Sequence, residues 1–143
     1  MSYIDITIKN LHNICFDCEN SGTTKCVRAK CNVGFAFNLT ELMQENKKLI
    51  VEDGLKLIPR ADTKYYDARM IARCIAAICK LCKGCNTNHT ELCAISLARK
   101  SIEGVILKES LDFPGNVLTY FVNVSEQNAD FANLIMEEFK RLD

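Results

Sequence analysis

The sequence predicts a single α+β domain, mainly helical, in which a small N-terminal β element packs on four to five helices and two cysteine-rich loops. Its 143 residues are close to the commonest size of one domain, and 48% apolar with 25% charged residues is ordinary for a folded chain. Several segments repeat apolar residues at helical spacing, whereas the first residues alternate. We therefore treat residues 1–143 as one domain.

The β element is predicted from period-two patterns. Isoleucines at positions 4, 6 and 8 alternate with polar residues over 3–9, which is typical of a half-buried strand. Residues 49–51 and 55–58 are two short apolar runs separated by Glu-Asp-Gly, so they predict two further strands joined by a turn.

The helices are predicted from apolar residues three and four positions apart. The first helix is predicted over 33–48. The second begins with Asp62 or Thr63 as its cap and ends at Gly84. The third covers 90–107 with Thr90 as its cap, and the last covers 131–142. The valines of 117–124 would suit a strand, but Pro114 just before this segment favours a helix start.

Charge and targeting signals exclude several classes. Lys plus Arg and Asp plus Glu each number 18, so the total charge gives no reason to expect a nucleic-acid partner. No stretch is long and apolar enough to cross a bilayer, and the N-terminus lacks the features of a signal peptide. We therefore expect a cytoplasmic protein without membrane contact.

Nine cysteines are the most unusual feature of the composition. In a reducing compartment they are not expected to form disulfides, and an odd number would leave one unpaired. Clustered cytosolic cysteines more often bind metal or carry out redox chemistry. The two cysteine-rich loops are accordingly predicted to be metal-binding.

The cysteines fall into two groups with a shared spacing. The spacing Cys-x2-Cys-x7-Cys occurs once in each group. A two-residue gap lets two thiolates converge, and four thiolates complete either a tetrahedral zinc site or the corner ligands of a cubane. The predicted ligands are Cys15, Cys18, Cys26 and Cys31 in the first group and Cys79, Cys82, Cys85 and Cys93 in the second.

The identity of the metal depends on the second group. Cys79-x2-Cys82-x2-Cys85 resembles the ligand run of bacterial ferredoxins, which implies an iron–sulfur cluster, although no Cys-Pro follows it and the resemblance covers only residues 79–85. A zinc site needs two separated cysteine pairs, so a third cysteine in the run is superfluous to it. We expect an iron–sulfur cluster, [4Fe-4S], with zinc as the alternative.

Three further residues could be ligands or simply structural. Cys74 lies on the apolar stripe of its helix, so it is predicted to be a small buried hydrophobe. His12 and His89 lie near the two groups and could replace a thiolate, but a histidine in a polar loop is usually solvated.

These observations lead to a functional hypothesis. We expect an iron–sulfur protein that acts in electron transfer, or as an accessory component, with a larger oxidoreductase as its protein partner. The alternatives are a zinc-stabilised protein-interaction module and a redox or metal sensor. The sequence has no phosphate-binding glycine loop, nucleophile elbow or paired-histidine metalloprotease motif, so we expect no enzymatic activity of its own.

Overall fold

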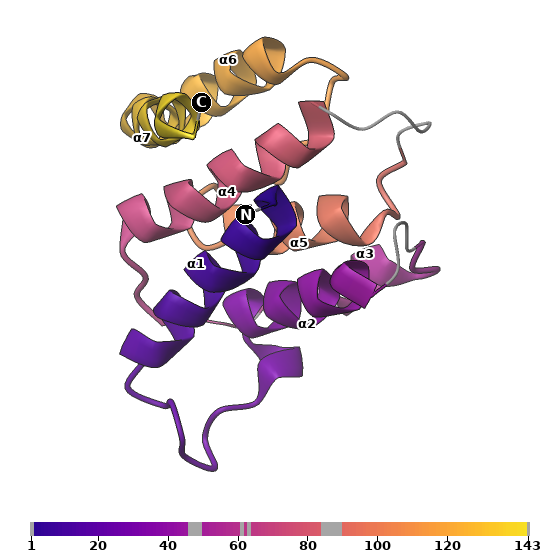
Figure 1. Ribbon diagram of the computed structural model, residues 1–143, viewed down its shortest axis with the longest axis vertical. Helices are drawn as coiled ribbons and strands as arrows, with labels where there is room; N and C mark the ends of the chain where they lie inside the picture. Colours follow the sequence, from indigo (N-terminus) through magenta and orange to yellow (C-terminus); the bar gives the residue numbers. More distant parts are fainter. Residues whose placement is uncertain (1, 46–49, 61, 63, 84–89, 143) are drawn as a thin grey trace.

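The computed structural model describes residues 2–45, 50–60, 62, 64–83 and 90–142, and over these ranges the fold is built from helices (Figure 1). The elements are α1 (Tyr3–Asp17), η1 (Arg28–Lys30), α2 (Asn32–Glu45), α3 (Gly54–Leu57), α4 (Ala68–Lys83), α5 (Ala94–Glu103), α6 (Val117–Gln127) and α7 (Ala129–Arg141). No helix in the described ranges is long and apolar enough to span a membrane.

The predicted N-terminal strand is wrong, because residues 3–17 form helix α1. The side chain of Ser2 caps this helix by accepting the N–H of Asp5. Thr7, Leu11 and Ile14 are buried at spacings of four and three, so the helical period governs packing over the whole segment. The short alternation of isoleucines lies inside this longer pattern.

The predicted strand pair around residues 49–58 is also wrong. Residue 49 lies outside the described ranges, Ile50 forms only an isolated antiparallel bridge with Cys93, and Gly54–Leu57 is helix α3. Asp53 has φ 59, in the left-handed region, and turns the chain into that helix. No strand is present in the described part of the chain, so the α+β class is corrected to an all-helical one.

The other helices confirm the period-based predictions, with shifted ends. Helix α4 starts later than predicted, because Asp67 accepts the N–H groups of Arg69 and Met70. The predicted cap at position 62 does not lie at the start of this helix, and Thr63 is outside the described residues. Helix α5 starts after Cys93. The segment after Pro114 is helix α6, as expected.

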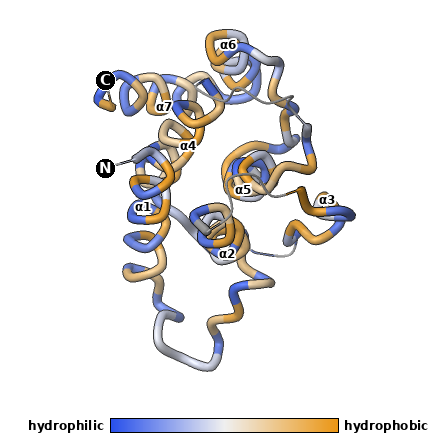
Figure 2. The backbone as a smooth tube through the Cα atoms, turned by 45° about the vertical axis from the view of Figure 1, so that its right-hand side comes forward, coloured by the Kyte–Doolittle hydropathy of each residue, from blue (hydrophilic) through white to orange (hydrophobic). Residues whose placement is uncertain are grey.

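Helix α4 lies between the two ends of the fold, with α1 and α7 packed against it and α2 packed against both α1 and α5 (Figure 1). Apolar residues line the inner faces of these helices (Figure 2). Helices α6 and α7 lie at one end of the molecule. The loop between α1 and η1 projects at the opposite end and carries the first cysteine group.

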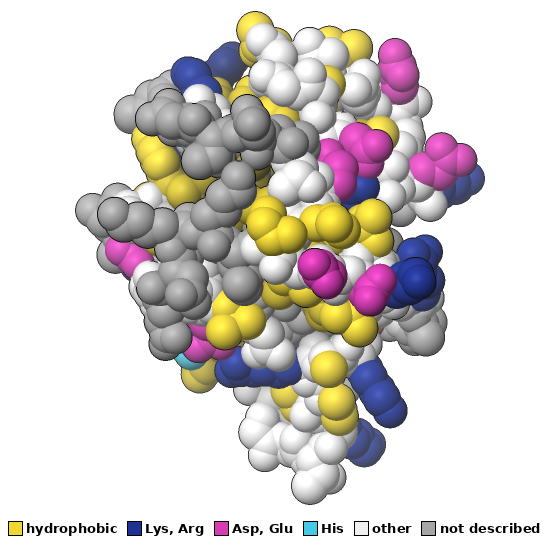
Figure 3. All heavy atoms as spheres, turned by 90° about the vertical axis from the view of Figure 1, so that its right-hand side faces the viewer, with side chains coloured by type: hydrophobic (Ala, Val, Ile, Leu, Met, Phe, Trp, Pro, Cys, Tyr) yellow, Lys and Arg dark blue, Asp and Glu magenta, His cyan; other side chains and the backbone are white. Residues whose placement is uncertain are grey.

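A charged network is buried between α5 and α6. The guanidinium of Arg99 donates to Glu103 at 2.5 Å, and the hydroxyl of Tyr120 donates to the same carboxylate. Arg99, Glu103 and Tyr120 are all fully buried, so each charge depends on its partner. On the face drawn in Figure 3, acidic and basic side chains are interspersed, in keeping with the balanced composition.

Candidate metal centre

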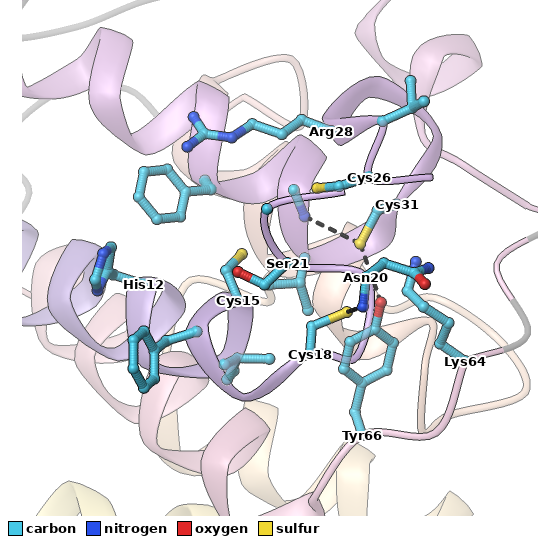
Figure 4. A pocket seen from close by; sticks show the side chains of 17 residues that line it. His12, Cys15, Cys18, Asn20, Ser21, Cys26, Arg28, Cys31, Lys64 and Tyr66 are labelled. Atoms are coloured by element: carbon cyan, nitrogen blue, oxygen red, sulfur yellow. Dashed lines mark hydrogen bonds between the residues drawn. The ribbon is translucent and has the colours of Figure 1, made fainter. Parts of the chain in front are cut away.

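The four cysteines of the first group line one cavity of about 220 Å³ (Figure 4). Cys15 lies in the last turn of α1, and Cys18 follows at the end of that helix in an extended conformation. Cys26 comes from the projecting loop, and Cys31 directly precedes α2. We call this space, lined by Cys15, Cys18, Cys26 and Cys31, the cysteine cavity.

Backbone N–H groups point at two of these sulfurs. The N–H of Asn20 donates to Cys18 Sγ and the N–H of Gly34 donates to Cys31 Sγ, both at 3.4 Å. The carbonyl of Cys31 accepts the N–H of Phe35 at 2.8 Å, so Cys31 Sγ lies at the N-terminus of the 14-residue helix α2. Backbone donors therefore face both sulfurs, and one of the two sulfurs also lies at the start of a helix.

Glycine at position 34 allows the close packing that shapes this cavity. A Cβ atom on Gly34 would lie 2.7 Å from Arg28 Cα and 2.9 Å from the carbonyl oxygen of Arg28. Both atoms belong to the backbone, so any side chain would push η1 away from α2. Gly34 therefore fixes the approach of the cysteine-bearing segment to the helix.

The electrostatics of the cavity show that the thiols interact. Burial, followed by the neighbouring thiols of Cys31, Cys26 and Cys18, raises the pKa of Cys15 to about 11, although Arg28 opposes this rise. Arg28 is held over the ring of Phe37 at 4.5 Å and by Glu41 at 2.9 Å. Several thiolates in one cavity repel each other, and a bound metal cation would compensate that charge.

Three residues that the sequence did not predict as part of the site lie beside Cys31 or are linked to it through hydrogen bonds and an ion pair: Tyr66, Asp62 and Lys64. The hydroxyl of Tyr66 lies 3.0 Å from Cys31 Sγ and donates to Asp62 at 2.7 Å. The ammonium of Lys64 lies 3.3 Å from Asp62. Burial opposes the charge of Lys64, but Cys31 and Asp62 outweigh it and raise the pKa of Lys64.

No sequence signal identified this group, because it approaches Cys31 from a segment more than thirty residues away. Burial, followed by the hydrogen bonds with Cys31 and Asp62, raises the pKa of Tyr66, so its hydroxyl keeps its proton. Burial opposes the charge of Asp62, yet hydrogen bonds from Tyr66 and two backbone N–H groups lower the pKa of Asp62. Asp62 is therefore an ionised carboxylate, and it accepts the hydrogen bond of the Tyr66 hydroxyl.

The four thiols surround the cavity and do not meet at one point. Among the described residues, no three Cys, His, Asp or Glu side chains converge closely enough to hold a single metal ion. Two thiolates on one tetrahedral zinc would lie about 3.8 Å apart, given a Zn–S distance of about 2.3 Å. In a cubane each thiolate binds a different iron, so the ligand sulfurs are spread around the group.

The second cysteine group is arranged differently. Cys79 is 1% exposed on the inner face of α4, where burial, followed by Cys82, raises its pKa. Cys82 is half-buried in the last turn of α4, and Cys93 caps α5. Cys85 lies outside the described residues, and none of the other three lines the cysteine cavity.

The remaining predictions have mixed outcomes. Cys74 is fully buried in the hydrophobic core, which confirms its predicted burial. His12 lies at the edge of the cysteine cavity with its ring centroid 6.2 Å from that of Phe37, and His89 lies outside the described residues. All eight described cysteines are free thiols.

Comparison with known proteins gives no relative from which a function could be transferred: no family model, no curated protein and no solved structure matches this chain. The assignment of a function therefore depends on the cysteine cavity alone.

Proposed function

We propose that this chain is an iron–sulfur protein in which Cys15, Cys18, Cys26 and Cys31 hold a [4Fe-4S] cluster. The observation that carries this proposal is that all four thiols line one cavity, although the outer two are sixteen positions apart in the sequence. Four cysteines are the usual complement of ligands for such a cluster. Its role would be electron transfer, or an accessory function, beside a larger oxidoreductase in the reducing cytoplasm.

The geometry supports a cluster better than a single zinc ion. The thiols line one cavity of about 220 Å³, and among the described residues no three of them converge on one ion, so a zinc ion would need the sulfurs to move together. The N–H groups aimed at Cys18 and Cys31 add support, because hydrogen bonds to ligand sulfurs are a usual means of tuning clusters.

The position of the cavity suits exchange of electrons with a partner. Cys26 is exposed, and so are Phe16 and Val27, which also line the cavity. A redox enzyme could therefore approach the cluster at the end of the molecule opposite α6 and α7. A second site formed by Cys79, Cys82, Cys85 and Cys93 stays a prediction.

Purification without oxygen tests the proposal. The protein should be brown and contain iron and acid-labile sulfide, and reduction should bleach it if the cluster carries electrons. Cys74→Ala is the matched control, since Cys74 is buried away from the cavity lining and should not alter the iron content. Colourless protein with stoichiometric zinc and no sulfide would refute the proposal and favour the interaction module, and slow bleaching in air would favour a sensor.

A further inference from the structure

A second cavity, of about 270 Å³, is lined by the segment that follows α3, by the end of α5 and by the first residue of α2, and no described cysteine lines it. Helices α3 and α5 lie side by side (Figure 2). We call this space the basic cavity, because three of its lining side chains are cationic: Arg60, Lys100 and Lys108. Among the described residues, Asp62 is its one acidic lining side chain.

Hydrogen bonds hold the walls of the basic cavity in place. The side-chain amide of Asn32 donates to the carbonyl of Pro59 at 3.2 Å and to that of Ser101 at 2.7 Å. The hydroxyl of Ser101 donates in turn to the carbonyl of Asn32 at 2.7 Å. The N–H of Leu107 donates back to the last residue of α5 at 2.8 Å. Pro59 and Leu107 each precede a cationic residue of the cavity, so the backbone at both cations is fixed, and a preformed site loses less entropy on binding.

Two of the charged groups in the lining already have partners of opposite charge. Lys100, which is 6% exposed, forms ion pairs with Asp112 and Glu91. The carboxylate of Asp62 lies 3.3 Å from the ammonium of Lys64 and also accepts backbone N–H groups. The charges of Lys100 and Asp62 are therefore compensated by their own neighbours, and the remaining two cations decide the net charge of the cavity.

Arg60 and Lys108 have no such compensation. Both are exposed, and no carboxylate in the described part of the chain lies within ion-pair distance of either side chain. A phosphate monoester carries a charge of about −1.5 to −2 at pH 7 and so matches two cations, whereas a carboxylate matches one. The planar guanidinium of Arg60 suits two phosphate oxygens at once, and the ammonium of Lys108 adds a point charge. The hydroxyl of Ser110, also in the lining, can donate a further hydrogen bond.

We propose that the basic cavity binds a phosphate group, free or as the ester of a small molecule, through Arg60 and Lys108. Its volume of about 270 Å³ is just below the range of about 300–1,000 Å³ usual for small-molecule pockets, so the ligand is small. The apolar side chains of Leu55, Ile58 and Leu107 complete the lining and can contact the carbon atoms of an ester. This site goes beyond the proposed function and does not depend on it, because none of its groups is a proposed cluster ligand.

Titration of the full-length protein with glycerol 3-phosphate at low ionic strength, followed by NMR, tests the proposal. We expect saturable shifts of the backbone N–H signals of Lys108 and Ser110. Arg60→Gln and Lys108→Gln should each weaken binding about tenfold, because each removes a charged hydrogen-bond donor. Lys56→Gln is the matched control: it removes an exposed positive charge from α3 outside the cavity lining, so binding should stay at the wild-type value.

Inorganic phosphate and acetate complete the test. Tighter binding of glycerol 3-phosphate than of inorganic phosphate would assign the site to an ester, and equal binding would assign it to the phosphate group alone; both support the proposal. Acetate bound as tightly as glycerol 3-phosphate would overturn it, and so would an absence of saturable shifts or an equal loss of affinity in Lys56→Gln. If a variant does not fold, the wild-type shifts decide: signals that move only outside the basic cavity would contradict the site.

Discussion

The two cysteine groups share the spacing Cys-x2-Cys-x7-Cys, yet the structure treats them differently. In the first group, α1 ends between Cys15 and Cys18, and Cys18 continues in an extended conformation that lets both residues reach the cavity. In the second group, α4 continues through Cys79 and Cys82, so Cys79 faces the core. Among the described residues, the cysteines of the first group line one cavity and those of the second group do not line it, so similar spacing along the chain does not by itself create a shared site.

This contrast predicts opposite effects of removing one thiol from each group. Cys31→Ala should abolish most iron binding and leave the fold of the metal-free protein largely intact, because Cys31 is half-buried at the cavity. Cys79→Ala should keep the iron of the cysteine cavity and lose about 1 kcal/mol of stability from a small core cavity. Iron content and urea unfolding of both variants measure this, and equal iron loss would show that the second group also binds the cluster.

Two glycines provide the next test, one beside the cysteine cavity and one away from it. Gly34→Ala should lower both iron content and stability, by about 1–3 kcal/mol, because its Cβ would meet the backbone of Arg28. Gly54→Ala would meet Leu97 Cδ1 at 2.3 Å, a side-chain atom of the core, so it should destabilise the fold and leave iron content unchanged. If Gly54→Ala loses as much iron as Gly34→Ala, the predicted role of Gly34 in shaping the cysteine cavity is wrong.

Stability at alkaline pH should reflect the buried thiol of Cys74. Burial raises the pKa of Cys74, so the folded state keeps a proton that the unfolded chain releases above about pH 8.5. Unfolding is therefore favoured as pH rises, by up to about 1.4 kcal/mol per pH unit for one thiol. Stability of metal-free protein, measured by urea unfolding between about pH 9 and 10, should fall less steeply for Cys74→Ala.

A control separates this proton effect from a simple loss of packing. Ile71→Val weakens the same core without removing a thiol, and should keep the wild-type slope with pH. A wild-type slope in Cys74→Ala would mean that other groups account for the alkaline loss of stability.

The smallest effect is expected at the surface ion pair of the cysteine-bearing segment. Arg28 and Glu41 are both 48% exposed, so Glu41→Gln should change the free energy of unfolding by less than about 1 kcal/mol and preserve iron binding. Arg28 would remain over the ring of Phe37. A marked loss of iron in this variant would show that the ion pair, and not the packing at Gly34, positions the segment.

Most helices could be predicted from periodicity, but two kinds of local pattern were misleading. Helices α2, α4 and α7 repeat apolar residues over three or four turns, which is long enough to distinguish period 3.6 from period 2. The alternation over residues 3–9 was too short for that distinction. The apolar runs on either side of residues 52–54 were likewise too short to indicate whether they pair as strands.

The sequence by itself determined which cysteines lie close together along the chain, because their spacing is visible without a fold. It also determined that Cys74 is buried, since its helical stripe is apolar. Only the tertiary structure decided that the first group lines a cavity and that Tyr66, Asp62 and Lys64 reach Cys31 from a distant segment. The physical reason is that the direction of a side chain depends on where a helix ends and on what packs against it.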